Sequence, residues 1–320
     1  MGSADGKIES TTKIVDKGHN SKCFNIVLLS EGFQKGDLNK YENYCDDFIK
    51  EFNKTSPFSN CTARINFFRI NVSSKESGAN DPKTKKPDGK VLCNGDNSSV
   101  KTYFDATYCS DGVIRRLIGV KKTLVFQVLN NKVPEWDRAI VIVNNTKIHG
   151  GSGDSISLAV TSVNGNWIKT TLHELGHTFG LADEYQCYIG CPPPPRPGED
   201  YHSSTEPNEP NVTTKKKRHE IKWRDLILPQ TPIPTLANPD CTKCNTLTNP
   251  EPANTVGLYE GAHYRHCRAY RPSHGCIMKS LSATDFCPVC QREILKAIAK
   301  FIKTFDLAIT PWGYDQSPPK

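Results

Sequence analysis

Apolar residues in the first half of the chain form strand-like runs that alternate with a helical stripe. Continuous apolar runs in CFNIVLLSEGF (23–33), ARINFFRINV (63–72) and RAIVIVNN (138–145) predict strands. Residues 37–54 predict a helix, because apolar side chains share one face: Leu38, Tyr41, Tyr44, Cys45, Phe48 and Phe52. Strands that alternate with helices favour an α/β fold with a mostly parallel sheet.

The pattern between these strands is less regular. Residues 73–90 have the composition of a loop. Residues 100–118 are expected to form a helix, and TLVFQVL (123–129) is expected to form a strand. GGSGDSISLAVTS (150–162) predicts an edge strand introduced by glycines, and a further helix is expected to begin near residues 166–170.

The second half of the chain changes character after Tyr185. CYIGCPPPPRPGED (187–200) cannot form regular structure, because consecutive prolines remove amide donors. KKKRHEIKWRDLI (215–227) is expected to form a short basic helix; its KKKR could be a processing site or contact an anionic surface, but a solvated position is expected. A final amphipathic helix carries an apolar face: Ile294, Leu295, Ile298, Phe301 and Ile302.

Composition narrows the class of protein. The chain has 320 residues, with 36% hydrophobic and 23% charged residues, as expected of a soluble globular protein that can bury a sizeable core. The net charge of +7 is modest and its lysines are scattered or in two short clusters, so no nucleic-acid role is expected. No apolar run approaches the roughly 18–20 residues that span a bilayer.

Cysteine content and glycosylation sequons favour an oxidising compartment. The chain has 13 cysteines, and an odd number leaves at least one outside intramolecular pairs. Together with the sequons they predict a secreted, disulfide-bonded glycoprotein. We expect that a signal peptide was removed or never present, since MGSADGK carries no apolar segment. The sequon acceptors are Asn53, Asn60, Asn71, Asn97, Asn144 and Asn211.

The stretch TTLHELGHTFGLADEY (170–185) combines metal-ligand chemistry with helical spacing. His173 and His177 are four residues apart, so on a helix both imidazoles share a face and can bind one metal ion. Glu174 projects beside such an ion, where a general base for an attacking water has to stand. A zinc ion with three protein ligands keeps its fourth position for water, whose pKa falls to about 7. The motif therefore predicts a hydrolytic Zn²⁺ site.

Gly180 and Asp183 suggest how the third ligand is supplied. A helix continued beyond His177 would carry later residues away from the ion, whereas glycine adopts positive φ at low cost and can turn the chain back. Asp183 is then placed to supply a carboxylate oxygen, and Glu184 is expected to point elsewhere. The alternative is an amphipathic helix whose histidines face water while these side chains pack inward: Leu172, Leu175, Phe179 and Leu181.

The pattern resembles the extended zinc signature of the metzincins, with Asp183 where most members carry a third histidine. The wider chain is similar to the IgA-peptidase family of zinc metallopeptidases. The segments that carry this resemblance are NIVLLSEGF (25–33), FFRINVSSKESGAN (67–80), HELGHTFGLADEY (173–185), YEGAHYRHCRAYRPSHGCIMKS (259–280) and FCPVCQREI (286–294).

The resemblance implies a metzincin-like zinc-protease fold and endopeptidase activity. It implies metal ligands at His173, His177 and Asp183, the general base at Glu174, and a methionine turn at Met278. About 95 residues separate Asp183 from Met278, so the intervening insertion could cover or shape the cleft. Ser280 lies where several metzincins carry a tyrosine, so no tyrosine is assigned to transition-state stabilisation. Cleavage of immunoglobulin A itself is not implied.

Other candidate groups have simpler interpretations. Cys241–Cys244 and Cys287–Cys290 could form a zinc knuckle, but they are further apart than the roughly 15–20 residues usual for one, so disulfides are expected. The edge strand at 150–162 could accept an extended substrate as an added strand, although a plain sheet edge fits equally well. Three histidines are expected to be ordinary hydrogen-bonding residues rather than ligands: His263, His266 and His274.

These observations predict a secreted zinc endopeptidase that acts on proteins or peptides, with no membrane span and an undetermined oligomeric state. Two alternatives stay open: a non-catalytic binding or adhesion module that retains the zinc site, and a zinc exopeptidase. Retention of Glu174 argues against the first, and the second needs a charged group closing the cleft. The expected parts are a flexible N-terminal segment (1–20), a catalytic domain (21–305) with upper (21–180) and lower (181–305) subdomains and a Pro/Cys-rich insertion (186–256), and a tail (306–320).

Overall fold

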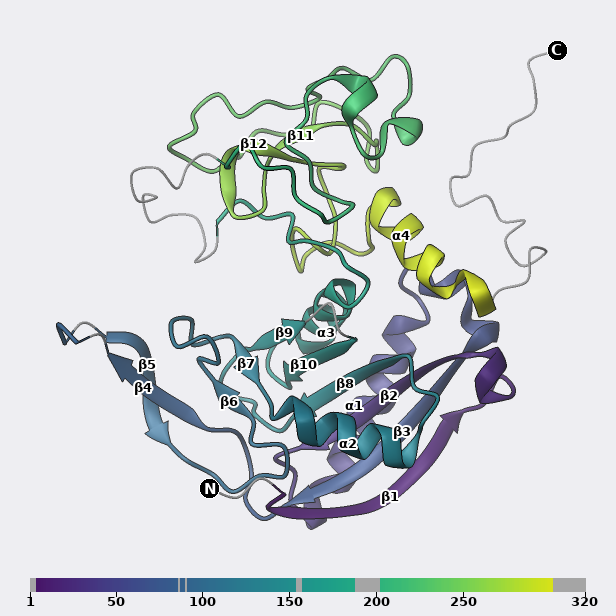
Figure 1. Ribbon diagram of the computed structural model, residues 1–320, viewed down its shortest axis with the longest axis vertical. Helices are drawn as coiled ribbons and strands as arrows, with labels where there is room; N and C mark the ends of the chain where they lie inside the picture. Colours follow the sequence, from purple (N-terminus) through teal and green to yellow (C-terminus); the bar gives the residue numbers. More distant parts are fainter. Residues whose placement is uncertain (1–3, 86, 90, 154–156, 188–201, 302–320) are drawn as a thin grey trace. The chain divides into compact units, whose positions relative to one another are not determined.

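The structure is a computed structural model that describes residues 4–85, 87–89, 91–153, 157–187 and 202–301 (Figure 1). The chain divides into two compact units. Unit 1 comprises Met1–Lys54 and Cys61–Thr178, and unit 2 comprises Thr55–Asn60 and Phe179–Lys320. Most of the proline-rich stretch at 187–200 and the predicted tail at 306–320 lie outside the described residues.

A six-stranded sheet forms the centre of unit 1, with the order β1-β3-β2-β8-β10-β9. The inner strands β3, β2, β8 and β10 are parallel, and β1 and β9 are antiparallel to their neighbours. The strands predicted near 23–33, 63–72 and 138–145 are confirmed, as is the mostly parallel sheet of a mixed α/β fold. The bounds are β1 Gly6–Val15, β2 Phe24–Glu31, β3 Ile65–Ser74, β8 Arg138–Val143, β9 Gly151–Gly153 and β10 Leu158–Ser162.

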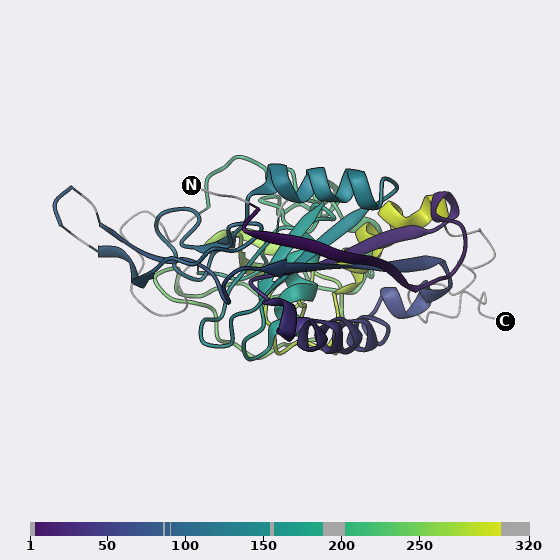
Figure 2. The same ribbon diagram turned by 90° about the horizontal axis from the view of Figure 1, so that it is seen from below.

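Helices cover both faces of this sheet, and Figure 2 shows α1 and α2 on opposite sides of it. The α-helices among the described residues of unit 1 are α1 (Leu38–Phe52), α2 (Lys122–Lys132) and α3 (Trp167–His177). On the α1 side, Phe67 of β3 packs edge-on against Phe52 with ring centroids 5.1 Å apart. All eight residues of β2 are buried, because a parallel strand between two helical layers has no solvent face.

The predictions for residues 100–129 are wrong. TLVFQVL lies in α2 rather than in a strand, and its buried residues Val125, Val128 and Leu129 follow helical spacing. Residues 100–118 form no helix, because their polar groups serve the buried carboxylate of Glu31. That carboxylate accepts hydrogen bonds from Thr102 Oγ1 at 2.6 Å, Phe104 N at 2.8 Å and Ala106 N at 2.9 Å. An amide that points at a side chain cannot form a helical ladder.

Two pairs of short strands and the N-terminal strand also depart from the predictions. The loop expected at 73–90 contains β4 (Asp81–Lys85), which pairs with β5 (Val91–Ser98), and β6 (Thr107–Tyr108) pairs with β7 (Ile118–Gly119). Residues 6–15 were expected within a flexible segment, but they form β1. Its polar side chains are compatible with a strand, because β1 lies at the sheet edge and none of its residues is fully buried.

Unit 2 contains little regular structure in its described residues. A hairpin joins β11 (Tyr259–Ala262) to β12 (Arg265–Arg271), and α4 spans Pro288–Ile298, close to the predicted C-terminal helix. The basic helix expected at 215–227 is wrong, because that stretch contains only two 3₁₀ turns, Arg218–Glu220 and Arg224–Leu226. Nowhere in the described chain does a helix combine the length and apolarity needed to cross a membrane.

Candidate metal centre

The two histidines of the HELGH sequence lie on α3, as their spacing requires. The ring centroids of His173 and His177 are 4.9 Å apart, and the rings are nearly perpendicular. His173 is 9% exposed and Glu174 6% exposed. The alternative in which both histidines face water is therefore wrong for His173, although Leu172 and Leu175 are buried as it expects.

Two glycines allow α3 to lie against the edge strand β9. A Cβ atom at Gly151 would lie 2.4 Å from Oε1 of Glu174, and one at Gly153 would lie 2.2 Å from the Glu174 carbonyl oxygen. Both distances are too short for any side chain. The glycines of GGSG therefore permit close backbone approach to the HELGH helix, a role that the sequence pattern did not reveal.

Strand β9 is an edge strand, but part of its outer edge is already covered. The Gly151 amide donates to the carbonyl of Arg116 at 3.2 Å, and Leu117 forms a parallel bridge to Gly151. Ser152 Oγ donates to the Ile118 carbonyl at 2.5 Å. A substrate strand therefore cannot use the Gly151 end of this edge without displacing residues 116–118.

The chain leaves α3 at His177 and turns at Gly180. Gly180 has φ of +79°, in the left-handed region that favours glycine. Asp183 and Glu184 follow in unit 2, and both are buried. The helix therefore ends before the third predicted ligand, which lies in an irregular segment of the chain.

A strained turn holds Asp183 within unit 2. The two-residue turn between β11 and β12 consists of His263 and Tyr264, with φ of +52° and +64°. Such turns usually contain glycine or asparagine, because positive φ strains other residues. The His263 amide donates to the Asp183 carbonyl at 3.1 Å, and the Tyr264 amide donates to Tyr185 at 3.0 Å.

The Tyr264 hydroxyl donates a hydrogen bond to Oδ2 of Asp183. This bond orients the carboxylate, and outer hydrogen bonds of this kind commonly fix metal ligands. Sequence reasoning missed Tyr264, because nothing in the pattern around residue 264 distinguishes it from other tyrosines. Only the hairpin places it beside Asp183.

Met278 lies in a turn that is bonded to the segment of Asp183. The amides of Lys279 and Ser280 donate to the Cys276 carbonyl at 2.9 and 3.0 Å, and Met278 is fully buried. The Met278 carbonyl accepts a hydrogen bond from the Glu184 amide at 2.9 Å. Glu184 and Met278, which are 94 positions apart in the sequence, are thus neighbours in unit 2. Ser280 is exposed.

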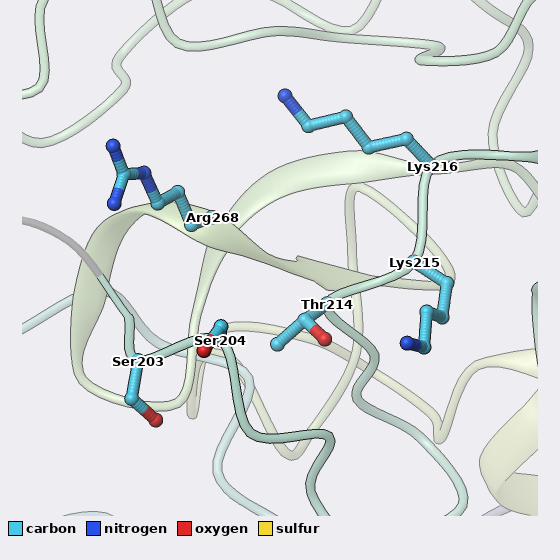
Figure 3. A pocket seen from close by; sticks show the side chains of 6 residues that line it. All are labelled: Ser203, Ser204, Thr214, Lys215, Lys216 and Arg268. Atoms are coloured by element: carbon cyan, nitrogen blue, oxygen red, sulfur yellow. The ribbon is translucent and has the colours of Figure 1, made fainter.

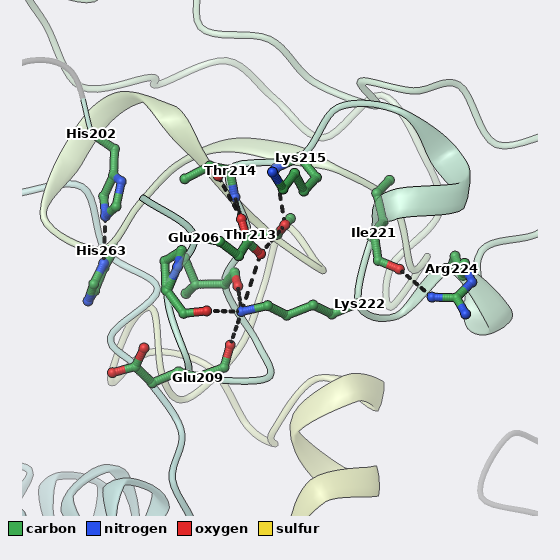
Figure 4. A network of polar contacts seen from close by, with 12 residues as sticks. His202, Glu206, Glu209, Thr213, Thr214, Lys215, Ile221, Lys222, Arg224 and His263 are labelled. Carbon is green, nitrogen blue, oxygen red and sulfur yellow. Dashed lines mark hydrogen bonds and ion pairs between the residues drawn. The ribbon is translucent and has the colours of Figure 1, made fainter. Parts of the chain in front are cut away.

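Two of the three remaining histidines have ordinary partners in unit 2. Nδ1 of His263 lies 2.9 Å from Nε2 of His202, and the rings stack (Figure 4). Burial lowers the pKa of His263, and this favours the neutral form in such a pair. His274 Nε2 lies 3.3 Å from the Leu247 carbonyl.

The disulfides of unit 2 do not join the two cysteines of a C-x-x-C pair to each other. Cys241 forms a disulfide with Cys267, and in unit 1 Cys93 forms one with Cys109. Cys244 lies 2.8 Å from Cys187, and Cys187 lies 3.0 Å from Nε2 of His266. Cys187, Cys244 and His266 are close enough together to hold a metal ion. Cys187 and Cys244 are disulfide-bonded, however, and a disulfide sulfur is not a thiolate ligand.

The prediction of disulfides is wrong for Cys287 and Cys290, which are free, buried thiols. They lie with Cys276 and Glu184 in a further cluster of possible metal ligands. The zinc knuckle is also wrong, because the two C-x-x-C pairs belong to different clusters.

Two predicted glycosylation sites are inaccessible in the folded protein. The Asn71 side chain is buried and donates to Glu42 Oε1 at 2.7 Å. Asn211 is fully buried and donates to the Ala182 carbonyl at 2.9 Å. A glycan on either side chain would break these hydrogen bonds, so neither sequon supports a glycoprotein.

A basic cavity of about 380 Å³ lies elsewhere in unit 2 (Figure 3). Lys215 and Lys216 of the KKKR sequence are exposed there, in agreement with the solvated position expected for them. Arg218 instead donates to the carbonyls of Leu228 and Thr231. The cavity contains none of the predicted site residues; its lining is Ser203, Ser204, Thr214, Lys215, Lys216 and Arg268.

Comparison with known proteins identifies the family. The sequence profile of the family described as IgA Peptidase M64 matches residues 12–246 and 242–298. A search of curated proteins finds no match to the chain. The profile covers α3, Asp183 and Met278, so the candidate residues lie within the matched region. This match spans most of the chain, which therefore belongs to the IgA Peptidase M64 family of metallopeptidases.

Proposed function

We propose that this protein is a zinc-dependent endopeptidase that cleaves protein substrates outside the cell. In this proposal His173, His177 and Asp183 hold the zinc ion and Glu174 is the general base. The observation that carries it is the arrangement on α3. The ring centroids of the two imidazoles are 4.9 Å apart, and the buried Glu174 lies between the two histidines in the sequence. A hydrolytic zinc site needs these residue types on one helix face.

The chemistry of the donor set supports zinc. Zinc binds imidazole nitrogen and carboxylate oxygen, and catalytic sites use three protein ligands. Asp183 is suited to such a role because the Tyr264 hydroxyl and the His263 amide fix its carboxylate and its main chain. The Gly180 turn and the Met278 carbonyl further constrain the segment that carries Asp183.

Glu174 performs the proton transfers in this proposal. A bound zinc ion would supply Lewis-acid activation of the attacking water and of the scissile carbonyl. Glu174 then accepts a proton from the water and later gives it to the leaving amine. The Glu174 side chain is buried against β9, which restricts its carboxylate to few orientations. Gly151 has no side chain and so leaves the space that Oε1 occupies.

An extracellular location is supported by disulfides in both units, among them Cys93–Cys109 in unit 1 and Cys241–Cys267 in unit 2. The substrate class follows from the family, whose members are peptidases. Cleavage inside a chain distinguishes the proposal from an exopeptidase, which must bind a free terminus.

The experiment that tests this proposal compares Glu174→Gln with Glu135→Gln, an exposed glutamate of unit 1. Each protein is assayed on a quenched fluorescent peptide whose ends are acetylated and amidated, and its zinc is counted by elemental analysis. Glu174→Gln should lower kcat/KM about 10²- to 10⁴-fold, because general-base catalysis contributes this much, while zinc content stays unchanged. Unchanged turnover in Glu174→Gln would remove the proposed base, and cleavage only of peptides with free ends would favour the exopeptidase.

A further inference from the structure

Three thiols and a carboxylate meet inside unit 2, apart from the residues of the proposed catalytic site. They belong to Glu184, Cys276, Cys287 and Cys290, which are all buried, and one ligand atom of each lies within 4.8 Å of the others. The sequence predicts only that the Glu184 side chain points in another direction than the catalytic metal ion. The structure shows that its side chain enters a cluster of sulfur atoms.

The distances in this cluster fit tetrahedral coordination. With Zn–S bonds of about 2.3 Å, two sulfur ligands are about 3.8 Å apart, and Cys276 Sγ and Cys290 Sγ are 3.8 Å apart. With a Zn–O bond of about 2.1 Å, sulfur and oxygen ligands are about 3.6 Å apart. Oε1 of Glu184 lies 3.1 Å from Cys290 Sγ and 3.8 Å from Cys287 Sγ.

The carboxylate of Glu184 is difficult to explain without a cation. The residue is fully buried, and Oε2 has no hydrogen-bond partner among the residues that the structure describes. Oε1 accepts a hydrogen bond from Asn211 Nδ2 at 3.0 Å. Burying a carboxylate is costly unless it is paired or coordinates a metal. A metal ion among the thiols would coordinate the carboxylate directly and add to the positive charge of the buried Arg271, which also acts on Glu184.

The backbone around the cysteines favours thiolates. Cys287 is the N-cap of α4 and Cys290 lies in its first turn, where the helix dipole stabilises negative charge. The Cys287 amide donates to Cys276 Sγ at 3.2 Å. Arg271 is buried in the same unit, and its positive charge partly offsets that of four anionic ligands.

We propose that Glu184, Cys276, Cys287 and Cys290 bind a structural zinc ion that is separate from the proposed catalytic ion. Three sulfur ligands and one carboxylate oxygen, each a ligand type that zinc accepts, would fill a closed, four-coordinate shell such as structural zinc sites have. The ion would join three segments: the one that follows Asp183, the turn that contains Met278, and the start of α4. It would also keep three thiols reduced in an oxidising compartment.

The first test uses the wild-type protein with Co²⁺ in place of zinc. Sulfur ligation produces intense thiolate-to-cobalt charge-transfer bands in the near ultraviolet, which histidine and carboxylate ligands do not produce. The expected spectrum contains these bands at one cobalt equivalent, and they persist in His173→Ala. Absence of the bands in fully loaded wild-type protein would overturn the proposal without any cysteine variant.

The second test counts zinc in variants of the two sites. Cys287→Ser should lose one zinc equivalent and the charge-transfer bands, whereas Cys45→Ser, which changes a buried free thiol of unit 1, should lose neither. His173→Ala should lose the other equivalent. A wild-type protein with one zinc that His173→Ala removes would overturn the structural ion and leave the proposed function intact. The opposite result, one zinc removed only by Cys287→Ser, would support the structural ion and contradict the catalytic one.

The third test examines the oxidation state of the thiols. Intact mass analysis after alkylation of the unfolded, unreduced chain should find Cys276, Cys287 and Cys290 modified as thiols. A disulfide between any two of them in the active protein would overturn the zinc site, because a disulfide removes two of its ligands.

Discussion

Units 1 and 2 satisfy their buried backbone groups in different ways. The described part of unit 1 is built around one six-stranded sheet and three α-helices, whose main-chain groups are paired in regular ladders. In unit 2 the described residues form one hairpin, one α-helix, short 3₁₀ turns and long irregular segments. In these segments charged side chains donate hydrogen bonds to main-chain carbonyls. Since buried amides and carbonyls must be paired in either case, the two units are expected to respond differently to substitution.

Side chains that bind several carbonyls are characteristic of unit 2. Lys222 Nζ donates to the carbonyls of Glu209 at 2.7 Å and Val212 at 2.8 Å, and also to Pro207 (Figure 4). Arg271 is buried and donates to Glu260 at 3.2 Å and to Gly261. Burial lowers the pKa of Arg271 to about 10, while the charge of Glu184 opposes this shift. Unit 2 thus depends on single polar side chains where unit 1 depends on repeated packing.

The largest effect is expected when a core side chain of unit 1 is truncated and leaves a cavity. Phe67→Ala should lower the free energy of unfolding by about 3–5 kcal/mol, because Phe67 is buried and packs against Phe52 and Phe48 of α1. Urea unfolding monitored by hydrogen exchange of β2 and β8 measures this loss. As a control, Phe301→Ala changes a partly exposed aromatic residue of unit 2 and should leave exchange in β2 unchanged. Little change in Phe67→Ala would contradict an apolar origin of unit 1 stability.

A smaller effect is expected when a polar anchor is removed from unit 2. Lys222→Met keeps the aliphatic stem but leaves three carbonyls without their donor, and hydrogen bonds to a charged group contribute about 1.5–3 kcal/mol. Hydrogen exchange of residues 206–214 should accelerate, with β2 and β8 unaffected. Lys217→Met is the matched control, because Lys217 is exposed and a surface change costs less than about 0.5 kcal/mol. Equal effects of the two variants would remove the contrast between the units.

The same difference explains which features could be predicted from the sequence. The strands of the parallel sheet appear as continuous apolar runs and α1 as a periodic apolar stripe, and the ligand spacing of His173 and His177 is a local helical signal. The structure of residues 100–118 could not be read in this way, because it depends on the distant carboxylate of Glu31. The cluster of Glu184 joins residues up to 106 positions apart, and no local pattern contains that information.

The smallest expected effect concerns the one ligand that unit 2 contributes to the proposed catalytic site. Tyr264→Phe removes the hydroxyl that orients the Asp183 carboxylate and keeps the ring. Loss of such an outer hydrogen bond weakens metal binding about 10- to 100-fold, or about 1.4–2.7 kcal/mol. Competition with a zinc chelator measures the change.

The control for this prediction is Tyr259→Phe on the neighbouring strand β11, whose hydroxyl donates to the Thr255 carbonyl at 3.3 Å. It should leave zinc affinity unchanged. The backbone of Tyr264 is strained at φ of +64°, and Tyr264→Phe keeps this strain, so only the hydroxyl is tested. An affinity equal to that of the wild type would show that the hairpin amides alone position Asp183. In that case an irregular segment would hold its ligand through the main chain, as α3 does for His173 and His177.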